Sequence, residues 1–233
     1  QDLPPADISM SGKEQREVEK ESYWTREQYI EWAEEFGKNE QWMNETFEFQ
    51  KDGTTIMEEN LYIFSTGIKH LPIGLIEVKG DLNISQNPSL KLDGYPKKVG
   101  GKFTCRLSAF STLEGIPEEI GGSIGLDNNF LVSLVGLPEV VNGAFLLNDN
   151  DLVTLKGLSM KIHGDLILSS NASLVSLDAL SGVRIDGDLY LYDILATEIP
   201  SKIEIKGSIW VRSSQTALAL DAKKKGYDVR VQD

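Results

Sequence analysis

Glycine and aliphatic residues recur along the last three quarters of the chain in a fixed frame. Seven glycines mark the frame, at steps of 21, 21, 21, 21, 23 and 20 residues. An aliphatic residue stands two positions before each glycine, and apolar residues stand two and four positions after it. Side chains alternate across a β-strand, so this apolar pair predicts a short strand with one buried face. The glycines are Gly80, Gly101, Gly122, Gly143, Gly164, Gly187 and Gly207.

Asparagine stands seven positions after four of these glycines, where the chain must turn away from the strand. An asparagine side chain can hydrogen-bond to the backbone groups that such a turn leaves unpaired. We therefore expect these side chains to stack as an internal ladder. Ile194 fills the slot in the coil that starts at Gly187, so the ladder should break there. The four asparagines are Asn87, Asn129, Asn150 and Asn171.

A repeat of this length predicts a solenoid, because each coil can bury its apolar face only against its neighbours. The segments 122–138 and 143–158 match the core pattern L-x-L-x-x-N-x-L almost residue for residue, and so resemble leucine-rich repeats. The lead-in of aliphatic-x-glycine-x-leucine is similar to a bacterial and phage-type variant of that repeat, and to receptor L domains. The resemblance implies an α/β solenoid over residues 57–233, a right-handed coil with one parallel sheet of about nine short strands.

The residues before the repeats predict a cap for the first coil. Thr25 and Gln28 fit the two ends of a capping box, and Gly37 fits a helix end, so we expect a helix between them. Segments 47–49 and 55–57 flank a turn and predict a hairpin. We divide the chain into a flexible polar segment (1–20), a helix and hairpin cap (21–56) and the solenoid (57–233), which ends in a helix over residues 216–225.

The net charge of −13 is concentrated at the N-terminus, since residues 1–60 carry sixteen acidic and six basic residues. No basic stripe exists for a phosphate backbone, so nucleic-acid binding is disfavoured. No apolar run approaches the ~20 residues that span a bilayer. Cys105 fills an inward slot and is expected to be a packed thiol. Because cysteine-rich caps are absent, we expect a reducing compartment, the cytoplasm, or a bacterial origin, although the start at Gln1 leaves secretion open. We also expect a monomer.

Candidate catalytic chemistry is sparse. His70 and His163 are the two histidines, and both fall in columns of the repeat that are expected to face solvent. We therefore expect no enzyme activity, no metal and no cofactor. The alternative uses Asp165 and Asp188, one residue after successive glycines and about 4.8 Å apart by strand spacing, as a carbohydrate-active or cation-binding pair. Each also fits ordinary Gly-Asp-Leu turn chemistry.

The exposed face of the predicted sheet offers a binding surface. Between the inward residues of successive coils, the outward column changes from small and polar to large and apolar. Tyrosine, tryptophan and arginine are the types that dominate binding hot spots. We expect this face to bind a protein or peptide, as the family resemblance also implies. An alternative is the targeting domain of a secreted bacterial effector. The predicted binding residues are Leu146, Asn148, Ile167, Tyr190, Tyr192, Trp210 and Arg212.

Overall fold

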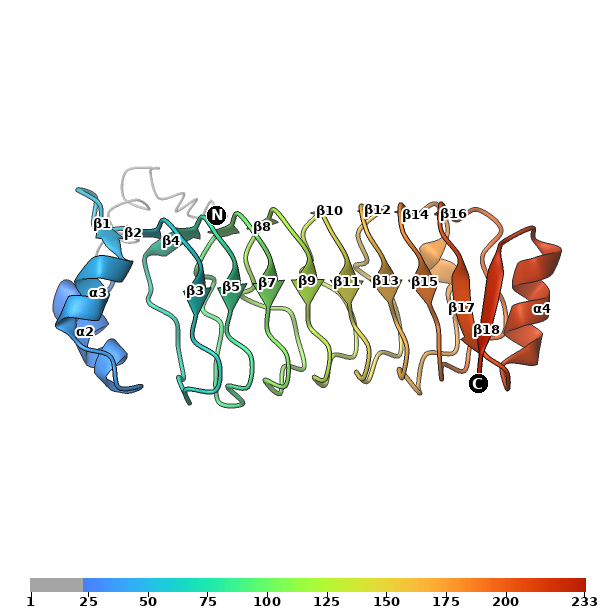
Figure 1. Cartoon of the computed structure of the whole chain (residues 1–233), viewed down its shortest axis with the longest axis horizontal. Helices are drawn as coiled ribbons and strands as arrows, with labels where there is room; N and C mark the ends of the chain where they lie inside the picture. The colour runs from blue at the N-terminus through green and yellow to red at the C-terminus, as the bar shows by residue number, and fades with distance from the viewer. Residues whose placement is uncertain (1–22) are drawn as a thin grey trace, which may run out of the picture.

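The computed structural model describes residues 23–233, which form a long stack of coils with helices at its two ends (Figure 1). Each regular coil contributes one short strand to each of two parallel layers. The buried side chains of all the coils join into one continuous hydrophobic core. The chain is thus a parallel β-solenoid, as the repeat period predicts.

Nine strands form one continuous sheet, which we name the long sheet. All its neighbouring strands are parallel, and equivalent positions of successive repeats pair with each other, as Leu82 with Phe103 and Tyr190 with Trp210. Its size agrees with the predicted nine short strands. The strands are β3 (Leu61–Tyr62), β5 (Leu82–Asn83), β7 (Phe103–Thr104), β9 (Ile124–Gly125), β11 (Phe145–Leu146), β13 (Leu166–Ile167), β15 (Leu189–Tyr190), β17 (Ile209–Arg212) and β18 (Val229–Gln232).

A second layer corrects the prediction of a single sheet. This layer contains the aliphatic residues that stand two positions before the glycines. It is divided into two parts, because no strand pairing joins β8 (Glu119–Ile120) to β10 (Val140–Val141) in the described part of the chain. We name it the divided sheet. Its first part holds an antiparallel strand, β1 (Glu48–Phe49), then β2 (Thr55–Met57), β4 (Leu75–Val78), β6 (Lys98–Val99) and β8 (Glu119–Ile120). Its second part holds β10 (Val140–Val141), β12 (Lys161–Ile162), β14 (Arg184–Ile185) and β16 (Glu204–Ile205).

The predicted asparagine ladder is present inside the turns. Asn129 is 4% exposed, and its Nδ2 donates to the carbonyl oxygens of Cys105 at 2.8 Å and Leu126 at 2.9 Å. Its Oδ1 accepts from the backbone N–H groups of Ser108 and Phe110. The side chain therefore joins two coils while satisfying buried backbone groups of both. Asn87, Asn150 and Asn171 make equivalent bonds.

The ladder breaks at Ile194, as the sequence predicts, and a glutamine resumes it. Ile194 is buried at 5% exposure and supplies no polar side-chain group. In the next coil, Nε2 of Gln215 donates to the carbonyl oxygens of Leu191 at 2.9 Å and Ile194 at 3.2 Å. Gln215 stands one position later than the usual asparagine, and its longer side chain spans the extra distance.

The residue before the ladder position is left-handed in seven coils, with φ between 51° and 59°. Left-handed backbone is unfavourable for most residues, but Asn and Asp tolerate it better than others. This column was not recognised in the sequence, where its members share no single residue type. They are Ser65, Gln86, Leu107, Asn128, Asp149, Ser170 and Asp193.

Leu107 is the least suitable member of that column, with φ +51° and half of its surface exposed. We expect Leu107→Asn to raise the free energy of unfolding by about 0.5–1 kcal/mol, because asparagine relieves backbone strain without loss of core packing. Urea unfolding measures the change. Leu195→Asn is the control, since Leu195 is 62% exposed but is not left-handed, and it should show no gain. Equal effects of both substitutions would mean that backbone strain is not the cause.

The first coil is covered by two helices, α2 (Arg26–Glu34) and α3 (Glu40–Thr46) (Figure 1). The predicted capping box between Thr25 and Gln28 is formed at the start of α2. Tyr29 and Trp32 of α2 are buried, and the indole Nε1 of Trp32 donates to the carbonyl oxygen of His70 at 3.0 Å. The helical segment is thereby fixed to the stack. The predicted flexible segment 1–20 lies outside the described residues.

The last coil packs against α4 (Thr216–Lys224), which buries Leu218 and Ala222. Within residues 23–233, the only helical turn in a coil is the short 3₁₀ segment η1 (Asp178–Leu180). The coils themselves are therefore built from strands and turns, and the described α-helices lie at the ends of the stack. In this respect the structure differs from the predicted α/β solenoid. None of the helices in the described residues is long and apolar enough to cross a membrane.

Candidate functional site

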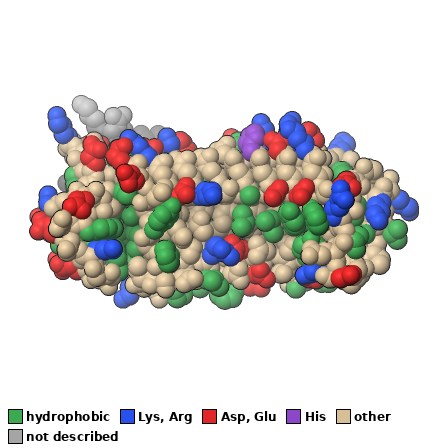
Figure 2. Space-filling view, viewed as in Figure 1, with side chains coloured by type: hydrophobic (Ala, Val, Ile, Leu, Met, Phe, Trp, Pro, Cys, Tyr) green, Lys and Arg blue, Asp and Glu red, His purple; other side chains and the backbone are tan. Residues whose placement is uncertain are grey.

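The structure places all seven predicted binding residues on the outer face of the long sheet. Leu146, Ile167, Tyr190 and Trp210 occupy paired positions on the adjacent strands β11, β13, β15 and β17. We name these four residues the apolar stripe. Each is half-buried, whereas the inward residues next to them are fully buried. Figure 2 shows hydrophobic side chains in a row across the right half of this face. The other predicted residues, Asn148, Tyr192 and Arg212, stand two positions after a stripe residue; Arg212 is the last residue of β17, and the other two follow the ends of β11 and β15.

The aromatic end of the stripe is held by a carboxylate. The rings of Tyr190 and Trp210 are nearly parallel, at 10°, with centroids 5.7 Å apart. Asp188 Oδ2 accepts from the indole Nε1 of Trp210 at 2.9 Å and from the hydroxyl of Tyr190 at 3.3 Å. Burial, and then the negative charges of Asp188 and Asp165, raise the pKa of Tyr190. The pair is therefore preorganised, which lowers the entropy lost on binding.

Tyr192 and Arg212 extend this aromatic cluster. The guanidinium carbon of Arg212 lies 4.8 Å from the ring centroid of Tyr192, in a cation–π contact. Arg212 Nε also pairs with Asp193 Oδ2 at 3.3 Å. The Tyr192 hydroxyl donates to Oε1 of Gln232 at 2.8 Å, and burial raises the pKa of Tyr192. These contacts fix the positions of two side chains that sequence spacing alone only placed on the same face.

Carboxylates border the apolar stripe on both sides. Asp165 and Asp188 lie two residues before stripe positions, and Asp149 and Asp193 lie three residues after them. Figure 2 shows acidic side chains directly above the hydrophobic row. The second border was missed in the sequence, because Asp149 and Asp193 belong to the left-handed column. We name these four residues the acidic rims.

Asp165 and Asp188, the pair considered as an alternative carbohydrate-active or cation-binding site, hydrogen-bond to the backbone of the next coil. Asp165 Oδ1 accepts from the backbone N–H of Asp188 at 2.8 Å, and Asp188 Oδ1 accepts from the backbone N–H of Ser208 at 2.7 Å. Asp81 makes the same bond to Lys102, at 2.8 Å. At Asp81, Asp165 and Asp188, the residue after the corner glycine thus caps the next coil. Both oxygens of Asp188 are occupied, and the described residues contain no group of three or more His, Cys, Asp or Glu side chains able to hold a metal.

Another pair of exposed aromatics lies at the opposite end of the same face. Tyr62 and Phe64 are 55% and 54% exposed. Tyr62 belongs to the predicted outward column, but the sequence does not single out this pair, because the neighbouring outward residues are small and polar.

A buried carboxylate marks the change from the polar half of the face to the apolar half. Asp127 Oδ2 accepts from Arg106 Nε at 2.6 Å and from Asn128 Nδ2 at 2.9 Å. Asp127 Oδ1 is the buried side-chain oxygen without a hydrogen-bond partner in the described residues. A pocket of about 250 Å³ lies next to this residue pair, and Arg106, Gly125 and Leu146 are among the residues that line it. Nothing in the sequence pattern indicates that this outward residue is buried.

The two histidines pair with carboxylates, and the cysteine is buried in the core. His70 Nδ1 lies 2.8 Å from Asp93, and His163 Nδ1 lies 3.0 Å from Asp186. Hydrogen bonds from Lys206, then from Arg184, lower the pKa of Asp186. Cys105 is fully buried, and burial raises the pKa of its thiol to about 12, so no reactive thiolate is expected.

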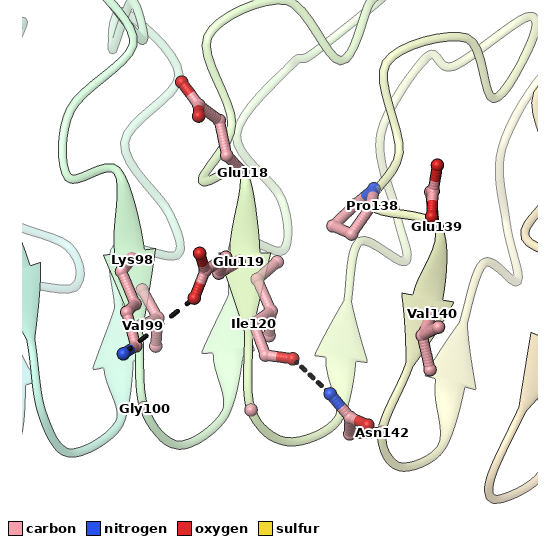
Figure 3. Close-up of a pocket in the computed structure, with 11 residues that line it drawn as sticks. Lys98, Val99, Gly100, Glu118, Glu119, Ile120, Pro138, Glu139, Val140 and Asn142 are labelled. Atoms are coloured by element: carbon pink, nitrogen blue, oxygen red, sulfur yellow. Dashed lines mark hydrogen bonds and ion pairs between the residues drawn. The ribbon is translucent and has the colours of Figure 1, made fainter.

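A cleft of about 300 Å³ lies where the divided sheet is interrupted (Figure 3). Asn142 Nδ2 donates to the carbonyl oxygen of Ile120 at 2.9 Å and so replaces a missing backbone bond. Lys98 Nζ lies 3.8 Å from Glu119, and Glu118 points away from both (Figure 3). The cleft is shallow and its charged groups are partly paired, so the long sheet offers the better binding surface.

No family model, no curated protein and no solved structure matches this chain.

Proposed function

We propose that the chain is a non-enzymatic binding module that presents the outer face of the long sheet to a protein or peptide partner. The observation that carries the proposal is the apolar stripe: four large apolar side chains on adjacent strands, half-buried and ending in an anchored aromatic pair. Adjacent large apolar side chains that remain partly exposed and are bordered by polar residues are a common feature of interaction sites. The resemblance to leucine-rich repeats, which bind proteins through a sheet face, supports the same role.

The stripe also has the composition of a binding hot spot. Tyr190, Trp210 and Arg212 belong to the residue types that contribute most to protein interfaces, and polar groups surround them. Their anchoring to Asp188 and Asp193 limits side-chain entropy loss on binding. Catalysis receives no comparable support, because Asp165 and Asp188 each use Oδ1 to accept the backbone N–H of the next coil, a structural role.

The test combines photo-crosslinking with a matched pair of double variants. A photoreactive amino acid at position 167 should crosslink a discrete partner from cell extract. Tyr190→Ala with Trp210→Ala should reduce that product about 30-fold, the effect of losing roughly 2 kcal/mol at a hot spot. Tyr62→Ala with Phe64→Ala removes two exposed aromatics from the other end of the same face and should leave it unchanged. Equal yields from both double variants, with thermal melting showing that both fold, would refute the proposal.

A further inference from the structure

We propose that the partner segment is a basic amphipathic helix, lying along the apolar stripe with lysine or arginine side chains reaching both acidic rims. This inference rests on the proposed function and names the chemistry of the partner. The length of the stripe, the charge on its borders and the distance between those borders all favour this one occupant.

The stripe fits a short helix in length. Leu146, Ile167, Tyr190 and Trp210 stand on four adjacent strands, so three strand spacings, about 14 Å, separate the two ends. An α-helix rises about 1.5 Å per residue, so roughly ten residues, or three turns, cover that length. Side chains at positions i, i+3, i+4 and i+7 of such a helix can all contact the stripe.

The borders of the stripe carry mainly negative charge. Asp165 and Asp188 lie on one side, and Asp149 and Asp193 on the other. Two cations lie at this end of the face, and both are paired with carboxylates: Arg212 with Asp193, and Arg230, in register with Trp210 on β18, with Asp228. On the other side of Leu146, Arg106 is neutralised by Asp127. The charges of Asp188 and Asp165 also contribute to the raised pKa of Tyr190, as expected in a negative potential.

The spacing of the rims favours a helix over an extended peptide. Asp193 follows Asp188 by five positions, of which the last two lie in a turn, so the two rims are at most about 16 Å apart. A helix with its side chains is about 10–12 Å wide, so basic residues on its flanks can reach both rims. In an extended peptide, the residues between apolar contacts point away from the sheet and cannot reach either rim.

The same charges argue against a second copy of this chain as the occupant. The chain carries a net charge of −13, and two copies meeting at the stripe would bring their acidic rims together. Like charges placed opposite each other disfavour association. A cationic partner gains both the apolar contact and the electrostatic attraction.

The experiment uses the full chain and three synthetic peptides of equal length. The first is a helical peptide with leucines on one face and lysines on both flanks. The second replaces every lysine by glutamate, and the third has the composition of the first in scrambled order. Fluorescence anisotropy should show binding of the first peptide at least tenfold tighter than binding of the other two.

Two pairs of isosteric variants test the rims. Asp149→Asn with Asp165→Asn should weaken binding of the lysine peptide roughly five- to tenfold. Both replacements suit the backbone, because Asp149 is left-handed and Asp165→Asn keeps a side-chain oxygen to cap the next coil. Asp81→Asn with Asp178→Asn changes the net charge equally but lies away from the rims, so binding should stay within twofold.

Three outcomes would contradict a basic helix as the partner segment. Equal binding of the scrambled peptide, equal effects of the two variant pairs, or no loss with Tyr190→Ala and Trp210→Ala would overturn it. If the crosslinked partner is captured through the stripe but contacts it without a basic helix, the inference fails while the proposed binding function stands. If no partner crosslinks at position 167 at all, the proposed function itself fails.

Discussion

Replacing Asn150 by alanine is expected to lower the free energy of unfolding by about 3 kcal/mol. Asn150 is 5% exposed, and its Nδ2 donates to the carbonyl oxygens of Leu126 at 3.0 Å and Leu147 at 3.1 Å. Its Oδ1 accepts from the backbone N–H of Leu131 at 3.0 Å. Alanine leaves the backbone N–H of Leu131 buried and unpaired, which costs about 1–3 kcal/mol. The carbonyl oxygens of Leu126 and Leu147 each lose one of two donors, since Asn129 and Asn171 still donate to them, and these two lost bonds contribute roughly 0.5–1.5 kcal/mol each.

The control for this prediction is the neighbouring asparagine. Asn148 lies two residues earlier on the outer face, and its side chain contacts only Asp149 at 2.7 Å in the described residues. Asn148→Ala should change stability by less than about 0.5 kcal/mol. Urea unfolding monitored by circular dichroism measures both variants. A loss below about 1 kcal/mol for Asn150→Ala would show that the ladder does not hold adjacent coils together.

Replacing Gly164 by alanine is expected to lower the free energy of unfolding by about 3 kcal/mol. Gly164 forms the corner between the two sheets, and an added Cβ would lie 2.6 Å from Ala144 N and 2.6 Å from Gly143 C. These are backbone atoms of the preceding coil, so no side chain can rotate away. Two coils would have to separate, and their strand hydrogen bonds would lengthen on both sheets.

Gly125 supplies the matched control, because it lies in the same stack but in an outward position. A Cβ at Gly125 would meet Thr104 Cγ2 at 3.3 Å, which is the end of a side chain. We expect Gly125→Ala to change stability by less than about 1 kcal/mol. Thermal unfolding of the two variants separates the corner effect from any general cost of replacing glycine. Equal losses would mean that close coil approach is not what requires Gly164.

The sequence predicted the long sheet because its two inward residues per coil stand two positions apart. Leu166 and Leu168, for example, are both fully buried. The divided sheet gave no such signal. Each of its two-residue parallel strands contributes one inward aliphatic residue, such as Ile162 next to Lys161, so alternation cannot be recognised over two residues. Its strands form only because neighbouring coils align them, and that information is not local.

The candidate site was predicted in part for similar reasons. Outward positions of the frame identified Leu146 and Trp210, and the structure places them on one face. Of the acidic rims, the sequence singled out Asp165 and Asp188 but not Asp149 and Asp193, because these two were not assigned to the left-handed turn that borders the strand. The burial of Asp127 depends on the side chain of Arg106 from the preceding coil, which spacing cannot reveal.

The interruption between β8 and β10 has a consequence for cooperativity. In a solenoid, stability is approximately a sum of coil terms and nearest-neighbour terms. The junction between the coils of β9 and β11 lacks the backbone pairing that the divided sheet supplies on either side of it, so the coupling term is smallest there. We therefore expect the stack to unfold as two cooperative units, although the long sheet pairs continuously across the boundary between them. That boundary falls where the outer face changes from Gly125 to Leu146, so the whole apolar stripe belongs to one unit. Partial unfolding that begins at the N-terminal end can stop at this boundary and leave the binding surface intact.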